Sequence, residues 1–380
     1  MCGLSGRVNL QGLTAFDYDL IIKMTDTLQH RGPDSSGYLY RQKAVLGHRR
    51  LSIIDLNTGD QPIHNENSTI WVVFNGEIYN FQILRRELEE RGHKFYTQSD
   101  TEVIVHLYEE MEVDCLTQLR GMFALALWDE PRERLLLARD RLGKKPLYYA
   151  LFDNTLMFGS EPKAILADAA VPRQIDPAAL DGYLTYLCVP PPRTIWQGIF
   201  KLPPAHWAIF DQNGLQTRRY WHLTFAADET ISENEAVDAL LDKLREAVRL
   251  RLISDVPLGV FLSGGVDSSL VVALMSQLQA APVKTFSIGF EYQAYNELPF
   301  ARRVAEQFDT DHHEWIVQVD AAGILPRLAW YFDEPFADPS AVPMFYVAQM
   351  ARQHVSVVLN GDGGDESFAG YGNHLGSLLR

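Results

Sequence analysis

Residues 258–270, LGVFLSGGVDSSL, restrict what this 380-residue chain can fold into more than any other stretch does. They begin with a short apolar run, pass through a loop that contains Gly264 and Gly265, and end in a second apolar run. A strand–loop–helix junction of this kind directs backbone N–H groups and the positive end of a helix dipole into one small space, which suits a phosphate. The sequence therefore predicts an anion-binding loop between a buried strand and a helix.

The side chains of this loop indicate which anion it binds. Three serines add hydroxyl donors to the two glycines: Ser263, Ser268 and Ser269. Asp267 would repel a phosphate unless a cation lay between them, so it predicts Mg²⁺. The Walker pattern GxxxxGK[ST] is absent. The loop resembles instead the SGGxDSS pyrophosphate loop of the ATP pyrophosphatases, which implies ATP as a substrate, whereas the alternative is an ordinary Ser/Gly turn.

A second loop rich in glycine and acid, NGDGGDE, occupies residues 360–366 after the apolar run 355–359. Clustered carboxylates repel one another, and a divalent cation shared with phosphate oxygens would relieve that repulsion. Between residues 256 and 359, segments with strand character alternate with segments of helical periodicity. This alternation predicts a doubly wound α/β domain with a parallel sheet, whose ligands lie at the carboxyl ends of its strands.

Charge and cysteine usage exclude several classes of function. The net charge of −15 opposes binding to nucleic acid or to an anionic membrane. Cys2, Cys115 and Cys188 are far apart and form no CxxC pair, which argues against a disulfide framework or a zinc finger. The apolar runs are too short to span a bilayer, and we expect a cytoplasmic protein.

The N-terminus places a thiol directly after the initiating methionine. Removal of Met1 would leave a free α-amino group on Cys2, and such an amine has a reference pKa of about 7.7 to 8.0, against about 8.5 for a thiol. The amine could then act as the base for the thiol of the same residue. Taken alone, a cysteine at position 2 is more often incidental.

Three features of the first half bear on function. The apolar strand 70–74 is expected to break at Asn75-Gly76, where a turn would direct N–H groups outward and could stabilise an oxyanion, although a plain hairpin turn is the alternative. Helices are expected over residues 16–30, 81–91 and 101–111, with Ser99-Asp100 as a helix cap. The basic pairs within 139–145 could bind phosphate, but ordinary loop charge is the favoured interpretation.

Five short motifs occur in order along this half: CGLSG (2–6), HRGPD (30–34), RLSI (50–53), FNGEIYN (74–80) and SDTE (99–102). Together they resemble the class II glutamine amidotransferase domain, which implies an α+β N-terminal-nucleophile fold, an αββα sandwich of two antiparallel sheets. The resemblance implies Cys2 as the nucleophile that attacks the glutamine amide. It also implies Asn75 and Gly76 as the oxyanion hole.

The same resemblance implies how glutamine is held. Arg50 would bind the α-carboxylate, and Glu77 with Asp100 would bind the α-ammonium group, alongside contacts from Asn75 and Gly76. These roles suit a free amino acid, which presents one charge of each sign, and arginine pairs with a carboxylate through two hydrogen bonds.

The NGDGGDE loop is similar to the SGDGGDE loop of asparagine synthetases, which implies that Asp365 and Asp267 hold Mg²⁺ and pyrophosphate. Asp362 falls where many members have glutamate and could take part in proton transfer. By the same resemblance four residues would line the adenosine and ribose of ATP: Leu262, Ile288, Asn360 and Gly361. The chain departs from the family pattern at Asn360, Ser367 and Ala369, which leaves open how the nucleotide is contacted and which acceptor is used.

The two halves together predict a glutaminase domain over residues 1–221 and an ATP pyrophosphatase-type domain over 222–380. The resemblance implies a glutamine-dependent asparagine synthetase that amidates aspartate through β-aspartyl-AMP. Its partners would be glutamine, aspartate and ATP, without nucleic acid or membrane, and a homodimer is compatible with the sequence. The family continues beyond the position of Arg380, so we expect a C-terminally truncated chain, with glutaminase activity alone as an alternative.

Three other interpretations remain. The acceptor could be a sugar or peptide carboxylate, since both half-reactions would be the same. The chain could be a non-catalytic remnant that binds nucleotide or a partner. Modification of tRNA, known for some related pyrophosphatases, is disfavoured by the acidic composition.

Overall fold

The computed structural model describes residues 1–226, 230–291, 296–318, 320–372, 374 and 376. The chain forms two compact units: Met1–Ala226 with Ala329–Asp338, and Ala227–Leu328 with Pro339–Arg380. Among the described residues, none of the helices has the length and apolar character needed to cross a bilayer.

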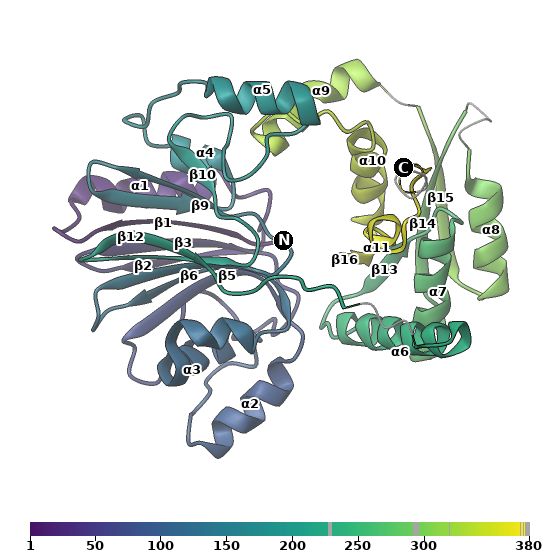
Figure 1. Cartoon of the computed structure of the whole chain (residues 1–380), viewed down its shortest axis with the longest axis horizontal. Helices are drawn as coiled ribbons and strands as arrows, with labels where there is room; N and C mark the ends of the chain where they lie inside the picture. The colour runs from purple at the N-terminus through teal and green to yellow at the C-terminus, as the bar shows by residue number, and fades with distance from the viewer. Residues whose placement is uncertain (227–229, 292–295, 319, 373, 375, 377–380) are drawn as a thin grey trace. The chain divides into compact units, whose positions relative to one another are not determined.

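Two six-stranded antiparallel sheets form the centre of the first unit (Figure 1). The strand order of one sheet is β10-β8-β9-β1-β3-β2, and that of the other is β12-β11-β7-β6-β5-β4. The first sheet consists of β1 (Gly3–Asn9), β2 (Ser35–Tyr40), β3 (Ala44–Arg50), β8 (Tyr148–Phe152), β9 (Thr155–Gly159) and β10 (Ile199–Lys201). The second consists of β4 (Ile63–His64), β5 (Ile70–Ile78), β6 (Gly121–Asp129), β7 (Arg134–Arg139), β11 (His206–Asp211) and β12 (Gly214–Arg219).

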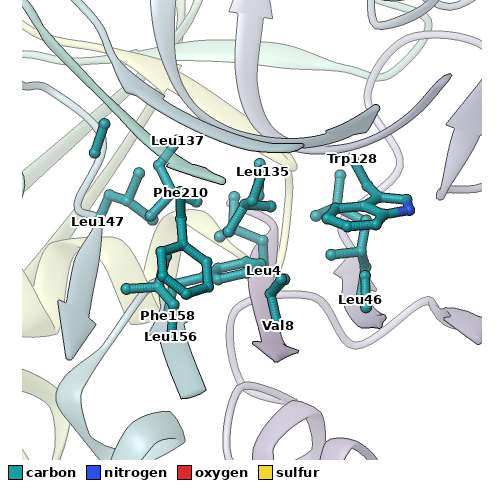
Figure 2. Packing of buried hydrophobic residues seen from close by; sticks show 14 of the residues in the cluster. Leu4, Val8, Leu46, Trp128, Leu135, Leu137, Leu147, Leu156, Phe158 and Phe210 are labelled. Carbon is teal, nitrogen blue, oxygen red and sulfur yellow. The ribbon is translucent and has the colours of Figure 1, made fainter. Parts of the chain in front are cut away.

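Apolar side chains that alternate along the strands fill the space between these sheets. Leu4 and Val8 of β1 lie in one cluster with Leu135 and Leu137 of β7 and with Trp128 of β6 (Figure 2). Burying a side chain of this kind contributes roughly 1.5 to 3 kcal/mol. The period of two along each strand is what commits these segments to a sheet with one face in the core.

Helices cover the outer faces of the sandwich. Helix α1 (Ala15–Asp26) packs on β1 and β3, and α3 (Glu102–Met111) packs on β4 and β5 beside α2 (Phe81–Glu90). The remaining helices of this unit are η1 (Glu112–Thr117), α4 (Pro162–Leu166) and α5 (Pro177–Tyr186). The predicted αββα arrangement of antiparallel sheets is confirmed.

The second unit contains a parallel sheet with the strand order β15-β14-β13-β16. Its strands are β13 (Leu258–Phe261), β14 (Lys284–Phe290), β15 (Asp311–Val317) and β16 (Val357–Leu359). Its helices are α6 (Glu233–Arg251), α7 (Val266–Leu278), α8 (Leu298–Gln307), α10 (Ala341–Ala351) and α11 (Gly364–Phe368), and α9 (Ala321–Phe332) begins here. The strand order reverses direction between β13 and β16, so the predicted doubly wound parallel sheet is confirmed and has its switch point there.

The segment Ala329–Asp338 falls within the predicted second domain but packs with the first unit. Two nearly buried ion pairs hold it: Lys163 with Asp333 at 3.2 Å and Lys201 with Glu334 at 2.5 Å. Because these pairs join residues far apart in the sequence, no local pattern indicates them.

Candidate active sites

Cys2 lies at the start of β1, half-buried, with its thiol against the backbone of Leu51. The Leu51 N–H donates to Cys2 Sγ over 3.4 Å, and Arg31 Nε donates to the Cys2 carbonyl over 3.0 Å. Burial raises the pKa of the Cys2 thiol, while the neighbouring amino terminus and Arg50 oppose that rise. Burial also lowers the pKa of the Met1 amino group to about 5. This amino group belongs to Met1, so it is not the amine that removal of Met1 would leave on Cys2.

The predicted turn at Asn75-Gly76 is wrong, because β5 continues without a break to Ile78. Gly76 does not adopt a positive φ; instead a Cβ at this position would lie 2.2 Å from the carbonyl oxygen of Met122 on β6. Glycine is therefore needed for the close approach of two strands. The buried side-chain nitrogen of Asn75 has no hydrogen-bond partner among the described residues, which leaves a donor available to a substrate oxyanion.

Glu77, half-buried on β5, and the buried Asp100 form a pair of interacting acids. The Ile78 N–H donates to Asp100 Oδ2 over 2.8 Å. Burial raises the pKa of Asp100 to about 6. Burial and the charge of Asp100 together raise the pKa of Glu77 well above its usual range. A cation between the two carboxyl groups would relieve this penalty, which is the environment that a substrate ammonium group requires.

Lys145 is a site residue that the sequence interpretation missed. Its side chain is buried, and burial lowers its pKa to about 8, while the charges of Glu77 and Cys2 act in the opposite direction. Asp140 builds the loop that carries it, since its carboxylate accepts the backbone N–H groups of Leu142, Lys144 and Lys145. The signal in the sequence was an aspartate followed within five residues by two lysines, which predicted ordinary loop charge.

Arg50, the last residue of β3, is almost fully buried. Its Nη1 contacts Asp60 Oδ1 at 3.0 Å, and its Nη2 donates to the carbonyl oxygens of Ile54, at 3.2 Å, and Asp55. The Asp60 carboxylate is 68% exposed. The Asp60 carboxylate thus pairs with the Arg50 guanidinium from the solvent side.

In the second unit, the loop between β13 and α7 has the predicted strand–loop–helix form. Gly264 has a φ of +84°, and a Cβ there would lie 2.6 Å from the backbone of Phe300. The hydroxyls of Ser263 and Ser268 lie 3.0 Å apart, and the Ser269 hydroxyl donates to the Gly265 carbonyl over 2.7 Å. Gly265 precedes the first residue of α7, so the start of this helix faces the loop.

The NGDGGDE loop meets the first loop across the switch point. A Cβ on Gly361 would lie 2.9 Å from Asp267 Cβ, and one on Gly364 would lie 2.3 Å from Asp267 Oδ2. Only glycines leave room for the Asp267 carboxylate in this cradle. Asp365 follows Gly364 directly, and its carboxylate lies against Gly370. The oxygen donors of Asp267 and Asp365 are of the kind that Mg²⁺ takes, so the residues present fit this ion.

The residues expected to line the nucleotide differ in exposure. Leu262 is buried in the core of the second unit, and its N–H donates to the Phe286 carbonyl over 2.9 Å. Ile288 is half-buried against a second cluster around Phe286. The Asn360 amide donates to Asp362 Oδ2 over 2.5 Å, which orients the side chain that stands where the family has serine. The Leu262 carbonyl also accepts the Ser287 hydroxyl, so both backbone groups of this buried residue are bonded to β14.

Comparison with known proteins matches two families along the chain. The "Glutamine amidotransferase domain" family matches residues 1–221, and the "Asparagine synthase" family matches residues 239–380. A putative glutamine-hydrolysing asparagine synthetase from Methanocaldococcus jannaschii is 37% identical over 99% of this chain and 76% of its own length. This chain belongs to the glutamine-hydrolysing asparagine synthetase family.

Two further family relatives show the range of similarity. Glutamine-hydrolysing asparagine synthetase 1 of Bacillus subtilis is 39% identical over 98% of this chain. The amidase chry2 of Gibberella zeae is 34% identical over 98% of the chain. The chain spans 59% of the length of each of these two proteins.

Proposed function

We propose that this chain hydrolyses glutamine at Cys2 and binds ATP at the 263–269 loop, as the glutaminase and nucleotide-binding parts of an asparagine synthetase. The observation that carries the proposal is the buried Cys2 thiol in the same unit as an unpartnered Asn75 amide and a pair of acids with raised pKa values. Thiol, oxyanion donor and ammonium site are the parts that glutamine hydrolysis needs. Membership of the family supports the assignment.

The glutaminase reaction follows from these groups. After removal of Met1, the amino group of Cys2 accepts the thiol proton as sulfur attacks the carbon of the glutamine side-chain amide. The Asn75 amide and the Gly76 N–H stabilise the oxyanion. The proton passes to the departing nitrogen, so ammonia and a thioester form, and water then hydrolyses the thioester to glutamate and free Cys2. Arg50 and the Glu77–Asp100 pair hold the α-carboxylate and α-ammonium groups.

The second site would activate the acceptor acid. The β-carboxylate of aspartate attacks the α-phosphorus of ATP, pyrophosphate leaves, and ammonia displaces AMP to give asparagine. Backbone N–H groups of residues 263–269 and the hydroxyls of Ser263, Ser268 and Ser269 hold the phosphates. Mg²⁺ held by Asp267 and Asp365 would neutralise the pyrophosphate. Both residues orient the leaving group.

A second acceptor class is supported by the similarity to a protein described as an amidase and by the departures at Asn360, Ser367 and Ala369. ATP–pyrophosphate exchange separates the candidates, because exchange requires the acceptor acid but not ammonia. Exchange that depends on aspartate supports asparagine synthesis. Exchange that depends on a uronic acid or a peptide carboxylate, and not on aspartate, would replace aspartate by that acid.

Glutamine hydrolysis by the purified chain tests the first half of the proposal. The wild type is expected to release glutamate, and Cys2→Ala should lower the rate at least 1,000-fold, about the loss expected when a nucleophile is removed. Mass spectrometry of the intact chain should show that Met1 is absent. Glutamate release that is unchanged by Cys2→Ala would refute the role of the thiol, and a retained Met1 would refute the role of the amine.

A further inference from the structure

We propose that Glu66, His93, His106 and Glu109 bind a divalent transition-metal ion in the first unit, at a site separate from the glutaminase residues named above. The four side chains offer two imidazole nitrogens and two carboxylate oxygens, and these atoms lie within 4.8 Å of one another. Two histidines and two carboxylates are a donor set typical of zinc.

Three neighbouring segments bring these residues together. Glu66 lies in the turn between β4 and β5, and His93 follows Gly92, whose φ of +103° ends α2. His106 and Glu109 are three residues apart on α3 and therefore project from one face of that helix. Helices α2 and α3 pack against each other (Figure 1), so the site joins the two helices to the edge of the second sheet.

The two histidines present equivalent atoms to the same pair of carboxylates. His93 Nδ1 lies 3.0 Å from Glu66 Oε1 and 3.8 Å from Glu109 Oε2. His106 Nδ1 lies 3.3 Å from Glu66 Oε2 and 3.4 Å from Glu109 Oε2. A tetrahedral zinc ion with bonds of about 2.1 Å separates its ligand atoms by about 3.4 Å. The observed separations bracket that distance.

The Nε2 atom of each histidine ring lies near a second carboxylate, which is not one of the proposed ligands. His106 Nε2 lies 3.4 Å from Glu102 Oε1, and His93 Nε2 lies 3.4 Å from Glu110 Oε1. A carboxylate that accepts the Nε2 proton fixes the tautomer with an unprotonated Nδ1, and metal-binding histidines almost always have such a partner. An ordinary cluster of surface ion pairs does not require this arrangement on both rings.

The ligands are held in place by the surrounding chain. The Asn65 amide donates to Glu109 Oε1 over 2.8 Å, which leaves Oε2 directed at the histidines. The Lys94 N–H donates to Glu66 Oε1 over 3.0 Å. His106 is fully buried. Binding would therefore require little reorganisation of the site.

A proton on His106 competes with a metal ion for this cluster of side chains. Although burial opposes its charged form, hydrogen bonds to Glu102 and Glu109 and the charge of Glu66 raise the pKa of His106 to about 9. A proton on His106 would neutralise part of the acidic charge without any metal. The experiment must therefore distinguish a bound metal from a protonated histidine.

The test uses the full chain with Cys2→Ala and Cys188→Ser, because a thiol beside a free amine also binds zinc and Cys188 is exposed. Millimolar Mg²⁺ is included to occupy the oxygen sites of the second unit. We expect one equivalent of Co²⁺ to give the visible d–d bands of a tetrahedral site, and zinc to displace it. In this background His93→Gln and Glu109→Gln should each lower zinc affinity about 100-fold, and Glu110→Gln about 10-fold.

Two matched variants serve as controls. His222→Ala and Glu87→Gln remove an exposed histidine and an exposed glutamate elsewhere in the first unit, and zinc affinity should change less than twofold. Thermal unfolding without metal checks that each variant folds. The proposal is overturned if no tetrahedral Co²⁺ bands form, or if His93→Gln and Glu109→Gln bind zinc as the controls do, which would leave the proton as the occupant.

Discussion

The interacting acids Glu77 and Asp100 make the stability of the first unit depend on pH. The pKa of Asp100 is about 6 in the folded chain, above its ordinary value of 3.8. As pH rises from about 4 to 6, the unfolded chain therefore loses this proton before the folded chain does, and the free energy of unfolding falls. Below this window both states are protonated and the penalty disappears. The fold therefore keeps a pair of acids that lowers its stability near neutral pH, and a substrate cation bound between them would neutralise their charge.

Glu77→Gln should remove the like-charge repulsion in this pair. Relative to wild type, we expect the variant to gain a few degrees in melting temperature between pH 4 and 7, since about 1 kcal/mol shifts the midpoint by roughly 2–4 °C in a domain of this size. Its KM for glutamine should rise about tenfold. Melting temperatures across pH 4–8 and glutaminase kinetics measure both effects. A pH dependence equal to that of the exposed control Glu87→Gln would contradict this account.

The charge of Cys2 raises the pKa of Lys145, so we expect the Lys145 ammonium in turn to favour the Cys2 thiolate. Lys145→Gln should therefore raise the thiol pKa, move the pH profile of iodoacetamide alkylation to higher pH by about one unit, and lower kcat/KM at pH 7 about tenfold. Lys144→Gln, on the exposed neighbouring residue, is the matched control and should leave the profile unchanged. Equal profiles for the two variants would show that Lys145 only builds the loop.

At the scale of elements, the segment Ala329–Asp338 depends on buried charges. The Lys163 ammonium contacts Glu161 at 2.7 Å and Asp333 at 3.2 Å, and it lies 4.1 Å from the Trp330 ring. Lys163→Met keeps the apolar stem but removes the ammonium partner of Asp333, while Glu161 keeps Arg31 and His30. Removing one partner of a buried pair costs about 3 to 5 kcal/mol. Hydrogen exchange in the 329–338 peptides should accelerate. Lys43→Met breaks the exposed Lys43–Glu133 pair and should cost at most about 1 kcal/mol, without that local effect.

Periodicity was enough to predict the antiparallel sandwich and the parallel sheet, because each strand and helix buries one face. Sequence reasoning failed at Gly76, which was interpreted as part of a turn. The glycine is needed instead because β5 and β6 approach closely there, and both situations favour a residue without a Cβ. Sequence reasoning also missed the position of Lys145 and the packing of Ala329–Asp338, which depend on contacts between distant segments. The strand–loop–helix form around residues 263–269 was predicted correctly because it depends on residues that are adjacent in the sequence, whereas the role of Cys2 stays a prediction.

At the scale of the whole molecule, the two proposed reactions are assigned to two compact units, so one substitution in each should separate them. Cys2→Ala is expected to abolish glutamate release while MgATP affinity changes less than twofold. Asp267→Asn is expected to weaken MgATP binding at least tenfold while the glutaminase kcat is retained, because it removes a carboxylate from the Gly361–Gly364 cradle and leaves the first unit intact. Asp255→Asn, at an exposed residue of the second unit, is the control.

Isothermal titration with MgATP and a glutamate-release assay, run on the same preparations, measure both sides of this separation. Reciprocal losses would show that ammonia release and nucleotide binding reside in different units and are linked only through the ammonia that one supplies to the other. If Asp267→Asn lowered the glutaminase kcat as much as it lowered MgATP affinity, hydrolysis of glutamine would have to depend on nucleotide binding itself. Ammonia would then be released only when nucleotide is bound. The timing of ammonia release, and not only the supply of ammonia, would protect the acyl adenylate.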